Sequence, residues 1–203
     1  MNQQNKICTI IGGPNGSGKS TVYDLLRPSG QFVNADVIAR QINPRDPEGV
    51  SISAGREALN QLSQLMAAGE SLVYETTLSS RQSLRLMEQC HSSGYQISLL
   101  FIALENAELH IRRVQERVKL GGHHIAPDAI TRRYESSFEN LPRAMALADE
   151  VLLVDNTGLE PALVIAMASG IVTTNDLLPG NGLHRRFALA LQRSAQLREQ
   201  QSS

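Results

Sequence analysis

Short apolar runs alternate along the chain with longer stretches in which apolar residues recur every three or four positions. The short runs have the length of β-strands, and the nearly continuous run at 97–102 is typical of a parallel strand covered by helices on both faces. The longer stretches have the period of amphipathic helices. Strands are predicted at 7–11, 31–34, 71–77, 95–104 and 150–155, helices at 21–26, 37–41, 54–66, 80–90, 107–120, 130–147 and 183–197, and a hairpin at 162–167 and 171–173.

This order of elements predicts a three-layer α/β/α fold with a mostly parallel central sheet, followed by a C-terminal hairpin and helix. A chain of 203 residues has room for one such domain, which we expect to span residues 1–198. The Gln- and Ser-rich residues 199–203 are expected to form a disordered tail.

Composition argues against several classes of function. The formal net charge is -1, so no overall positive field attracts nucleic acid. Aromatic residues make up 4% of the chain, which leaves few side chains on which bases could stack. Both features argue against a nucleic-acid partner. No apolar run approaches the roughly 18 residues of a membrane span. The two cysteines, Cys8 and Cys90, fit a reducing compartment and make neither a disulfide framework nor a zinc site. Because the polar residues 1–6 do not resemble a signal peptide, we expect a cytoplasmic protein without a membrane partner.

A glycine-rich stretch separates the first predicted strand from the first predicted helix. It consists of Gly13, Pro14, Asn15, Gly16, Ser17, Gly18, Lys19, Ser20 and Thr21. These residues fit the phosphate-binding pattern G-x-x-x-x-G-K-[ST], the P-loop or Walker A motif, in the strand-to-helix context that the pattern requires. Backbone N–H groups of such a loop point at phosphate oxygens, and the dipole of the following helix adds to the field. We therefore expect a P-loop NTPase fold and a site for a nucleoside triphosphate.

Two side chains of this loop have specific expected tasks. Lys19 would reach the β- and γ-phosphates, and the Ser20 hydroxyl would be a ligand of the Mg²⁺ ion that bridges them. ATP and Mg²⁺ are accordingly the expected cofactors. A plain glycine-rich turn is the alternative, but it would not require lysine and serine at this spacing.

Carboxylates stand where two further strands are predicted to end. Asp36 follows the strand at 31–34, where it could cap the next helix or accept the proton of an attacking hydroxyl. Glu75 is followed by Thr76 and suits the binding of a substrate or of a magnesium-bound water, although a glutamate at a strand end is commonly just solvated. Because parallel strands present their carboxyl ends at one edge, both carboxylates are expected near the glycine-rich loop.

Arginines are dense in the helical region around 107–135. Arg117 lies on the first helix of this region, and Arg132 and Arg133 lie on the second, after a glycine-containing break. In a phosphoryl-transfer enzyme this arrangement would be a lid that closes arginines over the triphosphate, whereas the alternative is a solvated charged surface.

Asp155 ends the last predicted core strand and could pass for a Walker B carboxylate. Because Asn156, Thr157 and Gly158 follow it at once, we interpret Asp155 as a turn residue with a structural task.

Four segments together resemble the zeta toxin family of kinases. They are Gly13–Thr21, Asn34–Arg40, Glu75–Ser79 and Arg113–His124. Zeta toxins are similar in fold to adenylate kinase, and characterised members phosphorylate a hydroxyl of UDP-N-acetylglucosamine. The resemblance extends over roughly 7–156 and implies an adenylate kinase-like fold.

The same resemblance assigns roles to individual residues. It makes Lys19 the phosphate lysine, Ser20 the magnesium ligand and Asp36 the general base. Glu75 and Thr76 fall in the substrate-binding strand end, and Arg40, in the segment with Asp36, is counted among the substrate-binding residues. Arg117 and one of the pair Arg132 and Arg133 fall on the lid arginines, with the choice within the pair left open.

The expected function is that of an ATP- and Mg²⁺-dependent kinase, a phosphotransferase with an alcohol group as acceptor. The acceptor would be a small molecule such as UDP-N-acetylglucosamine or a related nucleotide or sugar, and the resemblance makes an antitoxin protein a candidate partner. Two alternatives stay open, a polynucleotide 5′-hydroxyl kinase and a non-catalytic sensor module that binds ATP.

Overall fold

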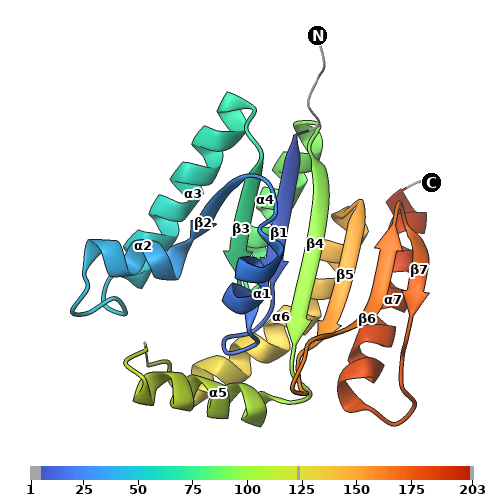
Figure 1. The fold of residues 1–203 in the computed structure, drawn as a ribbon. Helices are drawn as coiled ribbons and strands as arrows, with labels where there is room; N and C mark the ends of the chain where they lie inside the picture. Colours follow the sequence, from blue (N-terminus) through green and yellow to red (C-terminus); the bar gives the residue numbers. More distant parts are fainter. Residues whose placement is uncertain (1–5, 123, 202–203) are drawn as a thin grey trace.

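In the computed structural model, strands and helices alternate along the chain as the apolar pattern predicts (Figure 1). The structure describes residues 6–122 and 124–201. The elements in chain order are β1 (Ile7–Gly12), α1 (Lys19–Leu26), β2 (Gln31–Asn34), α2 (Ala35–Ile42), α3 (Ser51–Ala68), β3 (Leu72–Thr76), α4 (Arg81–Ser92), β4 (Gln96–Ala103), α5 (Ala107–Lys119), α6 (Pro127–Leu147), β5 (Glu150–Asp155), β6 (Ala162–Ala168), β7 (Ile171–Asn175) and α7 (Gly182–Gln201).

The sheet has seven strands in the order β2-β3-β1-β4-β5-β6-β7. The first five strands of this order pair in parallel, and β6 and β7 add an antiparallel hairpin at one edge. The expected mostly parallel sheet with a C-terminal hairpin and helix is therefore confirmed. Parallel neighbours need a crossover segment between them, and the helices between the strands supply it.

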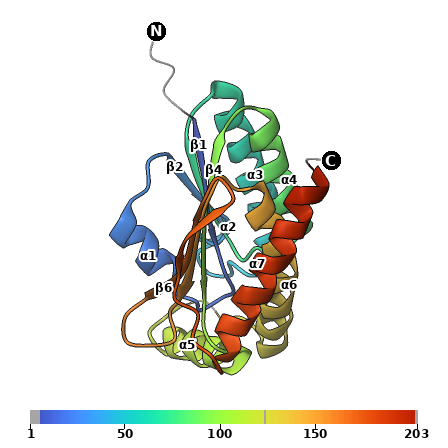
Figure 2. The same ribbon diagram turned by 90° about the vertical axis from the view of Figure 1, so that its right-hand side faces the viewer.

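Helices flank both faces of the sheet, although unevenly. Figure 2 views the sheet nearly edge-on, with α1 on one side and α3, α4, α6 and α7 on the other. The side chains of β4 divide between these faces: Phe101 belongs to the large cluster under the four helices, and Ile102 to a smaller cluster that includes Val22 of α1. Burial of both strand faces explains why this strand is a nearly continuous apolar run.

The register of the central strands brings their carboxyl ends together. Glu75 of β3 lies opposite Ile11 of β1 on one side and opposite Asn34 of β2 on the other. Gly12, the residue after Ile11, ends β1, and the glycine-rich loop begins at the next position. Asp36 follows Asn34 by two positions. The end of β3, the glycine-rich loop and the start of α2 therefore lie at one edge of the sheet, although they are distant in sequence. The helix α5 lies beyond this edge (Figure 1).

The expected disordered tail at 199–203 is in part wrong. The last helix, α7, continues to Gln201: its apolar residues Leu183, Phe187 and Ala190 are buried, and Arg198 near its end donates to the carbonyl oxygens of Met145 and Ala148. Residues 202 and 203 lie outside the described residues, as does His123 of the Gly-Gly-His-His segment. In the described part of the chain, none of the helices is both long enough and apolar enough to span a bilayer.

Candidate active site

The glycine-rich loop forms a compact turn between β1 and α1. Gly13 and Gly18 have φ angles of 141° and 95°, a region that side chains with a Cβ rarely adopt. A Cβ on Gly13 would collide with the carbonyl oxygen of Ile102, and one on Gly18 with the side-chain amide of Asn156. Glycine is therefore required at both positions by conformation and by close neighbours.

Lys19 begins α1 and is buried within the loop. Its Nζ donates hydrogen bonds to the carbonyl oxygens of Gly13 and Pro14 at 2.8 and 3.0 Å. Burial lowers the pKa of Lys19, and the charges of Glu75 and Asp36 oppose part of that shift. The ammonium group is thus held inside the curve of the loop, where a phosphate chain would enter.

Ser20 and Glu75 form a second polar contact at the same sheet edge. The Ser20 hydroxyl donates to the two carboxylate oxygens of Glu75 at 3.4 and 3.2 Å. Thr76, predicted with Glu75 as a substrate-binding residue, uses its hydroxyl differently. It contacts the hydroxyl of Ser83 at 2.9 Å and accepts from the backbone N–H of Leu78, so it shapes the turn after β3.

A cavity of about 160 Å³ lies beside the loop, between the segment that follows β2 and the pair α5 and α6. Its lining combines charged residues with small apolar ones: Ala35, Asp36, Ala39, Arg40, Pro47, Glu48, Ser51, Arg117, Gly122, Ile125, Ala129 and Arg133. Four of the predicted site residues, Asp36, Arg40, Arg117 and Arg133, are therefore brought to one cavity from three helices.

The interpretation of Asp36 as a helix cap is wrong. Asn34 caps α2, because its side-chain oxygen accepts from the backbone N–H groups of Asp36 and Val37 at 2.7 and 3.2 Å. Asp36 lies in the first turn of the helix, with its carboxylate exposed at the cavity. This leaves the carboxylate available for a proton-transfer role.

The structure distinguishes between the two adjacent lid arginines. Arg132 is exposed and is not among the cavity residues, whereas Arg133 is half-buried and lines the cavity. Nη1 of Arg133 donates to the side-chain oxygen of Asn15 in the glycine-rich loop at 3.0 Å. Of the pair, Arg133 therefore has the position expected of a lid arginine.

Two residues hold the outer side of the loop: His110, which the sequence analysis did not single out, and Asn156, which it named only as part of the turn after Asp155. His110 of α5 is completely buried, with Nδ1 2.8 Å from the carbonyl oxygen of Asn15. Asn156 donates from its side chain to the carbonyl oxygen of Ser17 at 2.8 Å, and its own carbonyl accepts from Arg113. Neither residue stands at a recognisable motif spacing, so the sequence carries no signal for these contacts.

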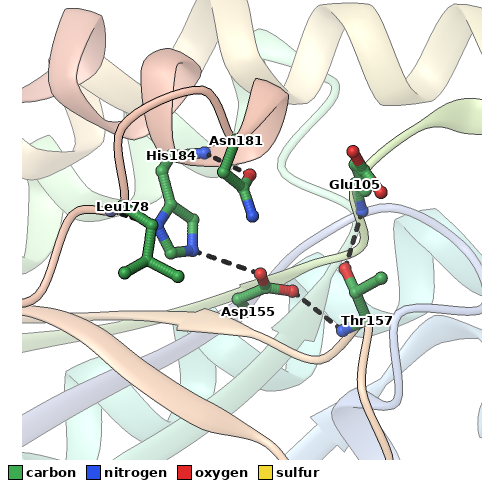
Figure 3. A network of polar contacts seen from close by, with 6 residues as sticks. All are labelled: Glu105, Asp155, Thr157, Leu178, Asn181 and His184. Carbon is green, nitrogen blue, oxygen red and sulfur yellow. Dashed lines mark hydrogen bonds and ion pairs between the residues drawn. The ribbon is translucent and has the colours of Figure 1, made fainter.

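Asp155 has the structural task that the following turn suggested. One of its carboxylate oxygens accepts from the backbone N–H of Thr157 at 2.8 Å, and the other lies 3.2 Å from Nε2 of His184 in α7 (Figure 3). Nδ1 of His184 in turn accepts from the backbone N–H of Leu178, which leaves the proton of a neutral ring on Nε2, facing Asp155. The carboxylate thereby joins the end of β5 to the C-terminal helix.

Comparison with known proteins gives a family match and a near relative. The family model described as an AAA domain, AAA_33, matches residues 9–141. An uncharacterised protein from Haemophilus influenzae is 36% identical over 123 residues, which cover 60% of this chain and 88% of that protein.

Solved structures with a similar fold include two of the AvrRxo1-ORF1:AvrRxo1-ORF2 complex and one of the PezAT system. The AvrRxo1-ORF1:AvrRxo1-ORF2 complex with sulphate ions gives a TM-score of 0.67 at 16% identity, covering 86% of this chain but only 62% of the other. A structure of AvrRxo1-ORF1:-ORF2 with ATP gives 0.63 at 14% identity, covering 98% and 77% of the two chains. The PezAT chromosomal toxin-antitoxin system of Streptococcus pneumoniae gives 0.62 at 15% identity, covering 98% and 89%. At these identities the shared property is the fold, a mostly parallel sheet flanked by helices with a P-loop after its first strand.

Proposed function

We propose that this chain, which belongs to the AAA domain family AAA_33, is an ATP-dependent kinase that phosphorylates a hydroxyl group of a small molecule. The observation that carries the proposal is the cavity beside the glycine-rich loop. It is lined by a carboxylate, Asp36, and by two arginines, Arg117 and Arg133, from opposite walls. A proton acceptor and cations around one cavity are what transfer of the γ-phosphoryl group to an alcohol requires.

The loop would bind the triphosphate by its backbone N–H groups, by the N-terminal dipole of α1 and by Lys19. Asp36 would take the proton of the acceptor hydroxyl while its oxygen attacks the γ-phosphorus. The bond from that phosphorus to the β,γ-bridging oxygen breaks, and ADP leaves with the electron pair. Arg117 and Arg133 would compensate the charge that the transferred group carries in this step.

The residues present fit a magnesium ion. The Ser20 hydroxyl and the Glu75 carboxylate are oxygen ligands of the kind that Mg²⁺ prefers, and they lie 3.2 Å apart beside Lys19. Mg²⁺ held there would neutralise charge on the β- and γ-phosphate oxygens. Glu75 is thus proposed as part of the magnesium site and not as a substrate-binding residue. Its contact with Ser20 supports this role.

The acceptor proposed for the first experiments is UDP-N-acetylglucosamine, with related nucleotides and sugars next. The motif resemblance to the zeta toxins supports this choice, and the fold is shared with the PezAT toxin-antitoxin system. The same two observations make an antitoxin protein a candidate partner. The charged and apolar parts of the cavity wall suit a hydroxylated molecule that also carries an anionic group.

The test is ATP consumption by the purified protein with Mg²⁺, with and without UDP-N-acetylglucosamine and then a panel of hydroxylated metabolites. Asp36→Asn should bind ATP normally and lose turnover by about 10²- to 10⁴-fold, because it removes the proton acceptor. Asp24→Asn, a change of the same kind on the exposed surface of α1, is the matched control.

Two results would contradict the proposal. If Asp36→Asn keeps its turnover, Asp36 is not the base. If ATP binds tightly but the wild type transfers phosphate to no acceptor, the chain is a nucleotide sensor, and a response to oligonucleotides with a 5′-hydroxyl alone would make it a polynucleotide kinase.

A further inference from the structure

We propose that Asn15 is a positioning residue, which holds the guanidinium of Arg133 in the direction of the γ-phosphate. The inference rests on the proposed kinase function and concerns a loop position that the phosphate-binding pattern leaves free. Its side-chain oxygen accepts a hydrogen bond of 3.0 Å from Nη1 of Arg133. Residues 118 positions apart are thus joined at the boundary between the phosphate loop and the cavity.

The backbone of Asn15 is fixed independently of its side chain. Nε2 of His110 accepts from the backbone N–H of Leu104 at 3.1 Å, so the ring nitrogen that carries the proton is Nδ1. Nδ1 then donates to the carbonyl oxygen of Asn15 at 2.8 Å. Burial lowers the pKa of His110 to about 4, which keeps this tautomer near neutral pH. Asn15 is therefore held at its carbonyl by α5 and presents its amide to α6.

The next residue shows how closely α5 approaches the loop. A Cβ on Gly16 would lie 2.8 Å from the carbonyl oxygen of His110 and 3.1 Å from Cγ2 of Val114. Val114 also packs with Ile125 and Ile130, which join α5 to the start of α6. This small apolar cluster fixes the α6 backbone near the loop, but it does not fix the end of the Arg133 side chain.

Asparagine suits the task of fixing that end. An arginine side chain loses considerable rotamer entropy when it is ordered, so a pre-formed hydrogen bond lowers the entropy that phosphate binding must overcome. The contact with Asn15 uses one of the five N–H donors of the guanidinium, and a neutral amide does not neutralise its charge. An aspartate at this position would instead form an ion pair, which would compete with the phosphate for Arg133.

This arrangement predicts a specific effect on nucleotide preference. Because Arg133 faces the position of the γ-phosphate, loss of its orientation should weaken binding of the triphosphate and leave binding of the diphosphate unchanged. A residue that only shapes the loop would affect both nucleotides equally, because the loop surrounds the phosphates that they share.

The experiment measures the affinities of Mg·ADP and of the non-hydrolysable β,γ-imido analogue of ATP by calorimetry. We expect Arg133→Ala to reduce the preference for the triphosphate by about tenfold, and Asn15→Ala to reproduce most of that loss. The double variant should fall no further than Arg133→Ala, since both changes remove one interaction. Asn15→Asp should reduce the preference more than Asn15→Ala, and Arg112→Ala, the loss of an exposed arginine on α5, should leave it unchanged.

Two outcomes would overturn the role of Asn15. One is an equal loss of ADP and triphosphate affinity in Asn15→Ala, and the other is that the single effects add in the double variant. In a kinase assay, Asn15→Ala should lower kcat with little change in the KM of the acceptor. The binding experiment needs no acceptor, so absence of phosphoryl transfer in the wild type would reject the proposed function and leave the coupling of Asn15 with Arg133 separately measurable.

Discussion

The hydroxyl of Ser20 lies 3.2 Å from a carboxylate oxygen of Glu75, although 55 positions separate the two residues along the chain. Parallel pairing of β1 and β3 produces this contact, because it sets Glu75 opposite Ile11 just before the loop that leads to Ser20. The strand next to β1 in the sheet thereby delivers a carboxylate to the first residues of α1. In the proposed function, this pair of oxygen ligands is where the magnesium ion would be held.

Replacing the carboxylate tests that assignment. Glu75→Gln should raise the Mg²⁺ concentration needed for half-maximal nucleotide binding by about tenfold, because it removes a charged oxygen ligand. Nucleotide affinity in the absence of Mg²⁺ should stay the same, and a magnesium titration followed with a fluorescent nucleotide checks both points. Ser20→Ala should act in the same direction, and Glu70→Gln, an exposed change before β3, is the control. If Glu75→Gln raises the KM of the acceptor and leaves the magnesium requirement unchanged, Glu75 binds the substrate and not the metal.

The two neighbouring arginines of α6 should differ sharply in their effect on turnover. Arg133 lines the cavity and Arg132 points to solvent. Arg133→Ala should lower kcat by about 10²- to 10³-fold, while Arg132→Ala should stay within about twofold of the wild type. Steady-state phosphorylation of the acceptor identified for the wild type makes the comparison. Equal losses in both variants would mean that overall charge, and not the position of Arg133, supports transfer.

The buried His110 predicts a dependence of stability on pH. Its pKa falls from 6.5 to about 4 in the folded protein, so between these values the unfolded chain binds more protons than the folded one. Stability should therefore decrease as the pH falls through this range, with a contribution from His110 of about 2 kcal/mol between about pH 7.5 and about pH 5. Urea unfolding at the two pH values measures it.

His110→Asn is the matched variant, because it removes the titrating ring and keeps an N–H donor near the Asn15 carbonyl. Between the two pH values, the free energy of unfolding of the variant should change by about 2 kcal/mol less than that of the wild type. If wild type and variant have the same pH dependence, His110 is not held neutral by burial.

Asp155 should matter for stability and not for nucleotide binding. Asp155→Ala removes the acceptor of the Thr157 N–H and of His184, so the free energy of unfolding should fall by about 2 kcal/mol. ATP affinity in the presence of Mg²⁺ should change by less than about twofold, as measured by calorimetry alongside denaturant unfolding. A loss of Mg·ATP affinity without a loss of stability would identify Asp155 as a Walker B residue after all.

Much of the fold follows from local pattern. The apolar run at 97–102 and the turn after Asp155 are read directly from the residues, since strand period, helix period and backbone-breaking residues act over a few positions. The phosphate loop is equally local, because its glycines, Lys19 and Ser20 belong to one contiguous segment whose backbone geometry they dictate. Thus the sequence predicted the type of site and the strand that leads to it.

Choices between similar neighbours were decided by tertiary structure. Asn34 and Asp36 are both good helix caps, and Arg132 and Arg133 are equally good cations, so residue type cannot separate them. In the structure α2 begins directly after Asn34, which caps it and leaves Asp36 at the cavity, and α6 places Arg133 at the cavity and Arg132 in solvent. A rotation of one residue along a helix, about 100°, is enough to exchange such roles.

The succession of strands and helices and the phosphate-binding loop follow from local sequence alone, because short-range sterics and apolar period specify both. Only the tertiary structure joined His110 and Arg133 to Asn15, and Asn156 to Ser17. Those contacts depend on strand order and helix placement, which bring together residues that lie far apart in the chain, and no local pattern encodes that distance.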